Sequence, residues 1–301
     1  MAAHSWVSAH LFYQGDMDDL LVRLVRPLVA DLAAEGLADA CFYLRYWEGG
    51  PHLRLRLRAA SVGALPGLRD LAATRCTQYL RTRPSPDVLG PSEYAVLATE
   101  LARRERRTSY ERTLRTNNTM AFVAYRPETW RYGTGPSLRA VERHFAASSR
   151  AALAALPLGH REAVGYAVIL LAWLVSPPAA NAAMRHDGAD TEQASAVKAR
   201  WDRHRDRLLQ DAQRLRTLVE RPGRGLLAEW AAAVRRLRGE LDQNLDLPGD
   251  RARNVSTVLD ICAHLMCNRL GVPLTAEPPL RRMAALTMAA LYDNEVNREL
   301  A

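Results

Sequence analysis

The sequence predicts an α+β protein, in which a ferredoxin-like β-α-β-β-α-β sheet region is followed by a helical C-terminal half. Two short segments, WVSAHLFY and ACFYLRYW, are rich in aromatic and β-branched residues, as strands are. The segment between them has its apolar residues at helical spacing. After residue 136 the pattern is almost wholly helical. Together these observations favour a sheet with helices on one face.

The elements of the sheet region follow one another in this order. Strands are predicted over residues 6–13, 40–47, 52–58 and 120–125, and helices over residues 17–36 and 65–83. EGGP at 48–51 is typical of a hairpin turn, so the second and third strands should be antiparallel. An insertion at 81–115 combines a Pro-rich loop with an exposed, charged helix over 92–115.

The second half is predicted to contain six helices, separated by Pro and Gly residues. They span about residues 137–156, 160–175, 190–219, 225–242, 251–270 and 278–298. We therefore expect an α/β region at 1–135 and a helical region at 136–301 packed on it, in one compact domain.

Composition excludes several classes of protein. Of the 301 residues, 48% are hydrophobic and 25% are charged, which is typical of a globular protein with a sizeable core. No secretory signal pattern opens the chain, and the longest apolar run, 164–175, is too short to span a bilayer. The four cysteines form no C-x-x-C pair. We therefore expect a cytoplasmic protein without disulfides, metal or organic cofactor.

The formal net charge is +8, and nearly all of the positive charge is arginine. A coding bias towards arginine explains this composition, and an anionic partner is the alternative. The chain contains no helix-turn-helix, zinc-finger or RNA-binding signature, so we expect neither nucleic acid nor a membrane as its partner. An acidic peptide is compatible with the charge.

The segment HLRLRLR at 52–58 alternates apolar and basic residues. On a strand its three leucines share one face, and Arg54, Arg56, Arg58 and His52 share the other. Guanidinium groups match carboxylates in a forked geometry, so the row predicts an anion-binding surface. A solvated, idle row of surface charges is the alternative.

Two further segments contain candidate functional residues. YRPETWRYGTG at 125–135 places Glu128, Arg131 and Tyr132 in a loop between a strand and a helix that begins near Pro136. The alternative is an ordinary connection closed by an Arg–Glu pair.

DICAHLMCNRLG at 260–271 is predicted to be helical, with Asp260, His264 and Asn268 at spacings of four residues on one face. A carboxylate one turn before a histidine can hold it as a general acid or base. A lone helical histidine with no catalytic role is the alternative.

Three of these segments, in this order, resemble the glutamate-elimination domain of class I lanthipeptide dehydratases. They are RYWEGGPHLRLR at 45–56, YRPETWRYGT at 125–134 and HLMCNRL at 264–270. The resemblance covers nearly the whole chain. Because the sequence shows no glutamylation domain, it resembles a stand-alone member of the family of the kind found in thiopeptide biosynthesis, and we expect such a protein.

The resemblance implies a set of site residues. The expected catalytic residues are His264, Arg54, Arg56 and Arg131. We expect the substrate to be bound by His52, Arg58, Trp47, Tyr132, Glu128 and Asn268. The implied partner is a modified precursor peptide, with its leader and its core. Partner enzymes of the same pathway are further candidates, and the oligomeric state is left open between a monomer and a homodimer.

The resemblance implies two chemistries on one scaffold. In the first, glutamate is eliminated from a glutamylated Ser or Thr; arginines hold the departing glutamate and a base removes the α-proton. In the second, two dehydroalanines undergo a formal [4+2] aza-cycloaddition. Loss of water and of the leader peptide then gives the central pyridine of a thiopeptide. This reaction needs a shaped pocket that brings the two reacting groups together.

Departures from the family pattern favour the second chemistry. Thr134 replaces the second Gly of the RYGG motif, and Ser148 replaces an expected Asp. The insertion at 81–115 can build a pocket wall, and aromatic residues such as Trp47 and Trp130 accompany the motifs. We therefore expect a pyridine synthase. Glutamate elimination and a non-catalytic leader-peptide-binding module are the alternatives.

Overall fold

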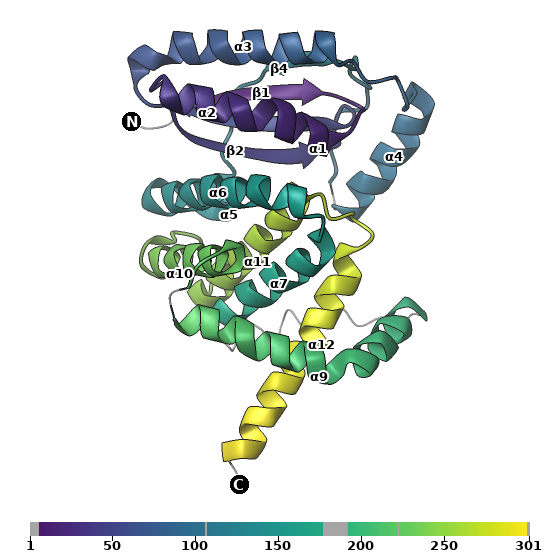
Figure 1. Cartoon of the computed structure of the whole chain (residues 1–301), viewed down its shortest axis with the longest axis vertical. Helices are drawn as coiled ribbons and strands as arrows, with labels where there is room; N and C mark the ends of the chain where they lie inside the picture. Colours follow the sequence, from purple (N-terminus) through teal and green to yellow (C-terminus); the bar gives the residue numbers. More distant parts are fainter. Residues whose placement is uncertain (1–5, 106, 177–191, 222, 300–301) are drawn as a thin grey trace. The chain divides into compact units, whose positions relative to one another are not determined.

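The computed structural model describes residues 6–105, 107–176, 192–221 and 223–299 (Figure 1). The chain folds into two compact units, Met1–Arg126 and Pro127–Ala301. Among the described residues, no helix combines the length and the apolar content that crossing a membrane requires.

The first unit contains a four-stranded antiparallel sheet with the strand order β2-β3-β1-β4. Its strands are β1 (Trp6–Phe12), β2 (Ala38–Tyr46), β3 (His52–Ala59) and β4 (Thr119–Phe122). All four predicted strands are present, with ends that differ from the prediction by up to three residues. This sheet and the mostly helical remainder confirm the α+β class, whereas the ferredoxin-like assignment stays a prediction.

Helices of this unit cover the leucine face of the sheet. The first is continuous from α1 (Met17–Leu20) through the π-helical turn η1 (Leu21–Val25) to α2 (Arg26–Ala34). A 3₁₀ turn, η2 (Val62–Ala64), leads into α3 (Leu65–Thr82). Both helices pack against the sheet. The three leucines of β3 are 0% exposed, which confirms the predicted division of this strand into an apolar and a basic face.

The predicted helix at 92–115 is wrong in its second part. Helix α4 (Pro91–Arg104) ends early, and no helix is present in the described residues between Arg104 and β4. The reason is tertiary: the chain beyond α4 binds the β2–β3 hairpin instead of continuing its own helical hydrogen bonds. The hydroxyl of Tyr94 accepts the backbone N–H of Gly49 at 2.7 Å and donates to the carbonyl of Glu111.

The hairpin turn is closed by glycines, as the sequence predicted. Gly49 and Gly50 have φ angles of 85° and 105°, which side chains rarely allow. A Cβ atom at Gly50 would also lie 2.6 Å from the Leu114 side chain. The turn and the segment after α4 are therefore fitted to one another.

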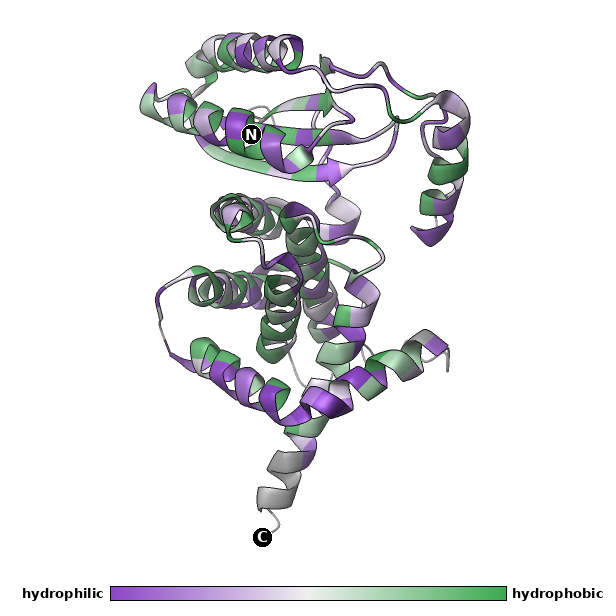
Figure 2. Cartoon of the chain, turned by 45° about the vertical axis from the view of Figure 1, so that its right-hand side comes forward, coloured by the Kyte–Doolittle hydropathy of each residue, from purple (hydrophilic) through white to green (hydrophobic). Residues whose placement is uncertain are grey.

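The second unit is helical throughout its described elements, which confirms the prediction for this half. Its helices are α5 (Thr129–Tyr132), α6 (Gly135–Ala155), η3 (Leu156–Leu158), α7 (Arg161–Val175), α9 (Glu192–Glu220), α10 (Leu226–Asn244), α11 (Arg251–Leu270) and α12 (Glu277–Glu299). The predicted helix at 190–219 begins two residues before the described part. Figure 2 shows hydrophilic and hydrophobic residues alternating along α9, as on an amphipathic helix.

One local feature of this unit differs from the prediction, and a second explains the long apolar run in the sequence. The predicted loop at 125–135 contains one helical turn, α5, so Arg131 and Tyr132 are helical and Glu128 precedes them. The apolar run at 164–175 forms the core of this unit as part of α7, where Val168 to Ala172 are 0% exposed.

Candidate functional site

The basic face of β3 is a row of four residues packed against aromatic rings. His52 is completely buried, and the three arginines are half-buried. Neighbouring strands complete the face, since His10 of β1 lies opposite Arg54 and Tyr46 of β2 lies opposite His52. The row therefore lies in a polar, aromatic layer rather than in open solvent.

His52 is part of the scaffold of this row. Its Nδ1 lies 2.9 Å from the carbonyl oxygen of Gly50, and its ring stacks on that of His10 at 5.0 Å. Burial, together with the charges of Arg54 and Arg56, lowers the pKa of His52 to about 4. For the same reasons the pKa of His10 falls to about 3. Both imidazoles are therefore neutral at pH 7.

Arg54 is held on three sides. Its Nε donates to Nε2 of His52 at 3.2 Å, and its guanidinium carbon lies 3.3 Å from the centre of the Tyr46 ring. Its Nη2 lies 3.4 Å from Oε2 of Glu48. Burial lowers the pKa of Arg54 from its usual value, which the neighbouring Glu48 opposes. The side chain is thus fixed in position before any substrate binds.

Glu48 is the central acceptor of this site, and sequence reasoning missed it. Besides Arg54, it accepts Arg107 Nη1 at 2.9 Å and the backbone N–H of Glu111 at 3.0 Å. Arg107 and Glu111 belong to the segment that the sequence predicted to be a solvated helix. The one available signal was the position of Glu48 in the turn before the arginine row.

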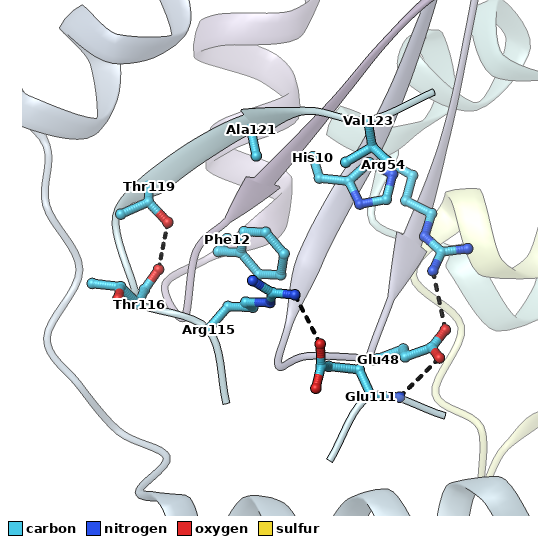
Figure 3. A pocket seen from close by; sticks show the side chains of 10 residues that line it. All are labelled: His10, Phe12, Glu48, Arg54, Glu111, Arg115, Thr116, Thr119, Ala121 and Val123. Atoms are coloured by element: carbon cyan, nitrogen blue, oxygen red, sulfur yellow. Dashed lines mark hydrogen bonds and ion pairs between the residues drawn. The ribbon is translucent and has the colours of Figure 1, made fainter. Parts of the chain in front are cut away.

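A cavity of about 430 Å³ opens on this face (Figure 3). It is lined by His10, Phe12, Glu48, Arg54, Glu111, Arg115, Thr116, Thr119, Ala121 and Val123. The segment after α4 contributes one wall, since Arg115 lies there and pairs with Glu111 at 2.8 Å. The part of the predicted insertion that is not helical therefore helps to build the cavity.

The other predicted residues of this unit lie outside the cavity lining. Arg56 lies over the ring of Tyr125 at 5.8 Å. Arg58 donates to both carboxylate oxygens of Asp39, at 2.6 and 3.1 Å. The indole N–H of Trp47 donates to Glu105 at 2.7 Å. Of the predicted residues in this unit, Arg54 is the one that lines the cavity.

In the second unit the motif around α5 divides into a surface pair and a core residue. Arg131 pairs with Glu128 at 2.9 Å and lies over the exposed ring of Trp130 at 4.5 Å. Tyr132 is 5% exposed and packs edge-on against Phe145, and burial raises its pKa. Tyr132 is therefore placed as a core residue of this unit.

The two departures from the family pattern have local hydrogen-bond roles. The backbone N–H of Thr134 donates to Oδ1 of Asp246 at 2.8 Å, and its hydroxyl donates to Oδ2 of the same carboxylate. Thr134 has a φ angle of −119°, so its position does not require glycine. The buried hydroxyl of Ser148 donates to the carbonyl oxygen of Phe145 at 3.1 Å.

His264 has a different partner from the one that the spacing predicted. Its Nδ1 lies 2.8 Å from Oε2 of Glu277, the first residue of α12. Asp260, one turn before His264, instead accepts Arg281 Nη1 at 2.6 Å and the indole N–H of Trp173 at 2.8 Å. Asn268 is half-buried one turn further along α11. The predicted Asp–His couple is thus wrong, and a Glu–His couple takes its place.

Glu277 and Arg281 are residues that sequence reasoning missed. Arg281 Nε donates to Oε1 of Glu277 at 2.8 Å, so each oxygen of this carboxylate has its own donor. Burial opposes the charge of Glu277, but the bonds from His264 and Arg281 hold its pKa below the usual range. The four-residue spacing of Glu277 and Arg281 at the start of a helix is typical of an ion pair between them, but it does not indicate a contact with His264.

The cysteines do not form a ligand set. All four are buried and none is in a disulfide, and burial raises the pKa of Cys76, Cys262 and Cys267 to about 12. In the part of the chain that the structure describes, no three His, Cys, Asp or Glu residues are grouped so as to hold a metal ion. The expectation that the protein uses neither metal nor cofactor stays a prediction.

Comparison with known proteins defines the class of this protein. The model of the lantibiotic biosynthesis dehydratase C-terminal family matches residues 6–288. The chain therefore belongs to this family. A search of curated proteins gave no match.

Three solved structures are similar to this chain. One is TbtD, the pyridine synthase from thiomuracin biosynthesis, with 22% identity, a TM-score of 0.79 and coverage of 96% of this chain and 99% of TbtD. A second is TsrL, with 18% identity, a TM-score of 0.63 and coverage of 96% and 95%. The third is MibB, a tRNA-dependent lantibiotic dehydratase from Microbispora sp. 107891, with 20% identity and a TM-score of 0.62; the match covers 99% of this chain and 29% of MibB. At these identities the similarities establish the fold.

Proposed function

We propose that this protein is a pyridine-forming enzyme of thiopeptide maturation. Its substrate is a precursor peptide that already carries dehydroalanine residues. The enzyme joins two of them in a formal [4+2] aza-cycloaddition, and water and the leader peptide then leave. The proposal goes one step beyond family membership, because the family also includes enzymes that eliminate glutamate.

The observation that carries the proposal is the charge balance of the cavity. Its charged lining consists of two arginines and two glutamates, paired as Arg54 with Glu48 and Arg115 with Glu111. His10, on the same wall, is neutral because its pKa is about 3. A pocket that binds a departing glutamate needs unpaired positive charge for its carboxylates. A charge-balanced pocket is better suited to an uncharged, dehydrated peptide.

The similarity to TbtD supports the proposal independently. The TM-score is 0.79 for TbtD, a pyridine synthase, and 0.62 for the dehydratase MibB, so the fold of this chain is more similar to that of TbtD than to that of MibB.

We assign the residues as follows. Arg54, held by His52 and Glu48, donates hydrogen bonds to peptide carbonyl groups, while Phe12, Ala121 and Val123 provide the apolar surface that brings the reacting groups together. His264 transfers protons, and Arg131 and Arg56 bind the peptide. Arg58, Trp47, Glu128 and Asn268 remain proposed contacts of the substrate. His52 and Tyr132 support the substrate contacts from the protein interior, since both side chains are buried.

One observation favours glutamate elimination as a second candidate. The four residues that this reaction is expected to use, Arg54, Arg56, Arg131 and His264, are all present. Arg54 also lines the cavity, where it could bind a carboxylate if its bond to Glu48 were exchanged. A leader-peptide-binding module without catalysis is the third candidate. The modified precursor peptide is the proposed partner in all three cases.

Mass spectrometry on two peptides distinguishes the candidates. The first peptide carries azoles and dehydroalanines, and the second carries glutamylated serines. Release of the leader from the first, with a product that absorbs as a pyridine, is the expected result. Loss of glutamate from the second peptide instead would establish elimination. Binding of both peptides without any change in mass would leave the leader-binding module.

A matched pair of variants links this reaction to the cavity. Arg54→Ala should abolish most of the turnover. Arg75→Ala should retain it, because Arg75 lies on α3 and pairs with Asp31 at 2.6 Å, away from the cavity lining. Equal activity in the two variants would show that the reaction takes place elsewhere in the molecule.

A further inference from the structure

We propose that Glu277 is the positioning residue of His264: it accepts the Nδ1 proton, fixes one tautomer of the imidazole and leaves Nε2 to exchange protons with the substrate. The proposal rests on the proposed function for the identity of that substrate. The geometry of the couple stands without it.

The couple has one buried and one exposed member. The side chain of Glu277 is 8% exposed, that of His264 is 41% exposed, and the two are joined through Nδ1 at 2.8 Å. Among the residues that the structure describes, no side chain or backbone group bonds to Nε2 of His264. The imidazole therefore has a protein-bound side and a side that is open to a ligand.

The charge of Glu277 decides which atom holds the proton. The bonds from His264 and Arg281 keep the pKa of Glu277 below its usual value despite its burial, so this carboxylate is ionised at neutral pH. An ionised carboxylate can only accept hydrogen bonds. Nδ1 must then donate, and in the neutral ring Nε2 is the unprotonated nitrogen that can take up a proton.

The carboxylate is itself held in place from three helices. Arg281 of α12 donates to Glu277 at 2.8 Å and to Asp260 of α11 at 2.6 Å. Asp260 is fixed in turn by the indole N–H of Trp173 on α7 at 2.8 Å. Cys267 is a further titratable neighbour of Glu277, and it stays neutral because burial raises its pKa to about 12. The positive charge of Arg281 is thus shared between two carboxylates.

This arrangement suits the loss of water that follows ring closure. Nε2 of the neutral imidazole takes the proton that the new ring loses. The same nitrogen gives that proton to the departing hydroxyl group, which leaves as water, and the histidine returns to its first state. The ionised Glu277 stabilises the imidazolium between the two steps, as a buried carboxylate does for a catalytic histidine.

Nuclear magnetic resonance of the ¹⁵N-histidine-labelled wild-type protein tests the tautomer directly. The expected spectrum shows His264 protonated at Nδ1 and unprotonated at Nε2 in its neutral form. Assignment uses His264→Gln as the reference. The opposite tautomer would overturn the proposal. Because this experiment needs no substrate, it decides the proposal even if the proposed reaction proves to be wrong.

Kinetics of Glu277→Gln test the consequence for the reaction. We expect kcat to fall by about 10²-fold, with KM within about twofold of the wild-type value, because the neutral amide no longer stabilises the protonated ring. In this variant, the limb of the pH–rate profile that depends on the protonation of His264 should move to lower pH. The matched control is Glu240→Gln, which removes a carboxylate that pairs with Arg143 in the same unit.

The results that overturn this proposal can be distinguished from a failure of the Glu277→Gln variant to fold and from a failure of the proposed function. Wild-type kcat and an unchanged pH profile in Glu277→Gln would overturn the proposal, as would equal changes in kcat and KM. If that variant does not fold, the tautomer of the wild-type protein still decides. If the wild-type protein leaves both test peptides unchanged, the proposed function fails, while the spectrum still reports on the Glu277–His264 couple.

Discussion

His52 of the sheet unit and His264 of the helical unit lie in opposite electrostatic environments. In the sheet unit, His52 and His10 stack on one another beside Arg54 and Arg56, and both have low pKa values, about 4 and about 3. In the helical unit, His264 bonds to the ionised carboxylate of Glu277. A histidine that is buried among cations stays neutral and supports structure, whereas a half-exposed histidine beside an anion can carry a proton. The residue type alone does not distinguish these roles.

The largest expected effect comes from His264→Ala. If this histidine transfers the proton, its loss should reduce turnover by about 10²- to 10⁴-fold, with peptide affinity nearly unchanged. Product formation measured by mass spectrometry and peptide binding measured by fluorescence anisotropy separate the two quantities. Equal losses in rate and affinity would assign His264 a structural role and remove the contrast between the two units.

Arg54→Ala should have the next largest effect. The guanidinium is fixed by His52, Tyr46 and Glu48 before the substrate binds, so its loss should lower kcat by about 10²- to 10³-fold, as for other preorganised hydrogen-bond donors. The variant should fold, because Glu48 keeps its bonds to Arg107 and Glu111. Circular dichroism checks the fold, and wild-type turnover would refute the assignment.

The neutral histidines of the sheet unit predict a loss of stability in acid. The pKa of His52 is about 4 in the folded protein, whereas the ordinary value of a histidine is 6.5. Between these pH values the unfolded chain binds a proton that the folded protein excludes. The free energy of unfolding should therefore fall as the pH drops from 6.5 towards 4, by about 3 kcal/mol for this residue.

Urea unfolding followed by circular dichroism at several pH values measures this dependence. His52→Asn should show a weaker pH dependence than the wild-type protein. The matched control is His204→Asn, since His204 is exposed on α9, in the other unit. An unchanged slope in His52→Asn would show that this histidine is not kept neutral by burial and by its arginine neighbours.

The smallest effect is expected from Thr134→Gly, which restores the second glycine of the family motif. The variant loses the bond from the Thr134 hydroxyl to Asp246 but keeps the bond from its backbone N–H. We expect a loss of about 1 kcal/mol in stability and the same reaction product. Thermal unfolding and product analysis check both points. A change of product would make this residue a determinant of the reaction, contrary to its local role in the structure.

The sequence predicted much of the fold because the relevant patterns are local. Alternation along residues 52–58 assigned the leucines and arginines to opposite faces of β3, and both faces are as expected. The predicted helix at 251–270 coincides with α11. The insertion was the main error, since nothing in its charge pattern shows that Arg107 and Glu111 bind the hairpin at Glu48.

The candidate site was only partly predictable. Strand alternation and helical spacing pointed to Arg54 and His264 as candidates, the resemblance implied their catalytic roles, and the structure gives each of them a fixed partner. The partners themselves, Glu48 and Glu277, were missed. A spacing of four residues on one helix pointed to Asp260 as the partner of His264, but a bond to a residue thirteen positions away on the next helix replaces it.

The α+β class, the faces of the strands and the positions of most helices could be predicted from sequence alone, because a periodicity of two or 3.6 residues is a property of neighbouring positions. Which charged residues pair with one another follows only from the tertiary structure. These pairings depend on how the insertion packs against the hairpin in the first unit and on how α11 packs against α12 in the second. They decide, in turn, that His52 is a buried neutral support for Arg54 while His264 is a half-exposed imidazole held by a carboxylate.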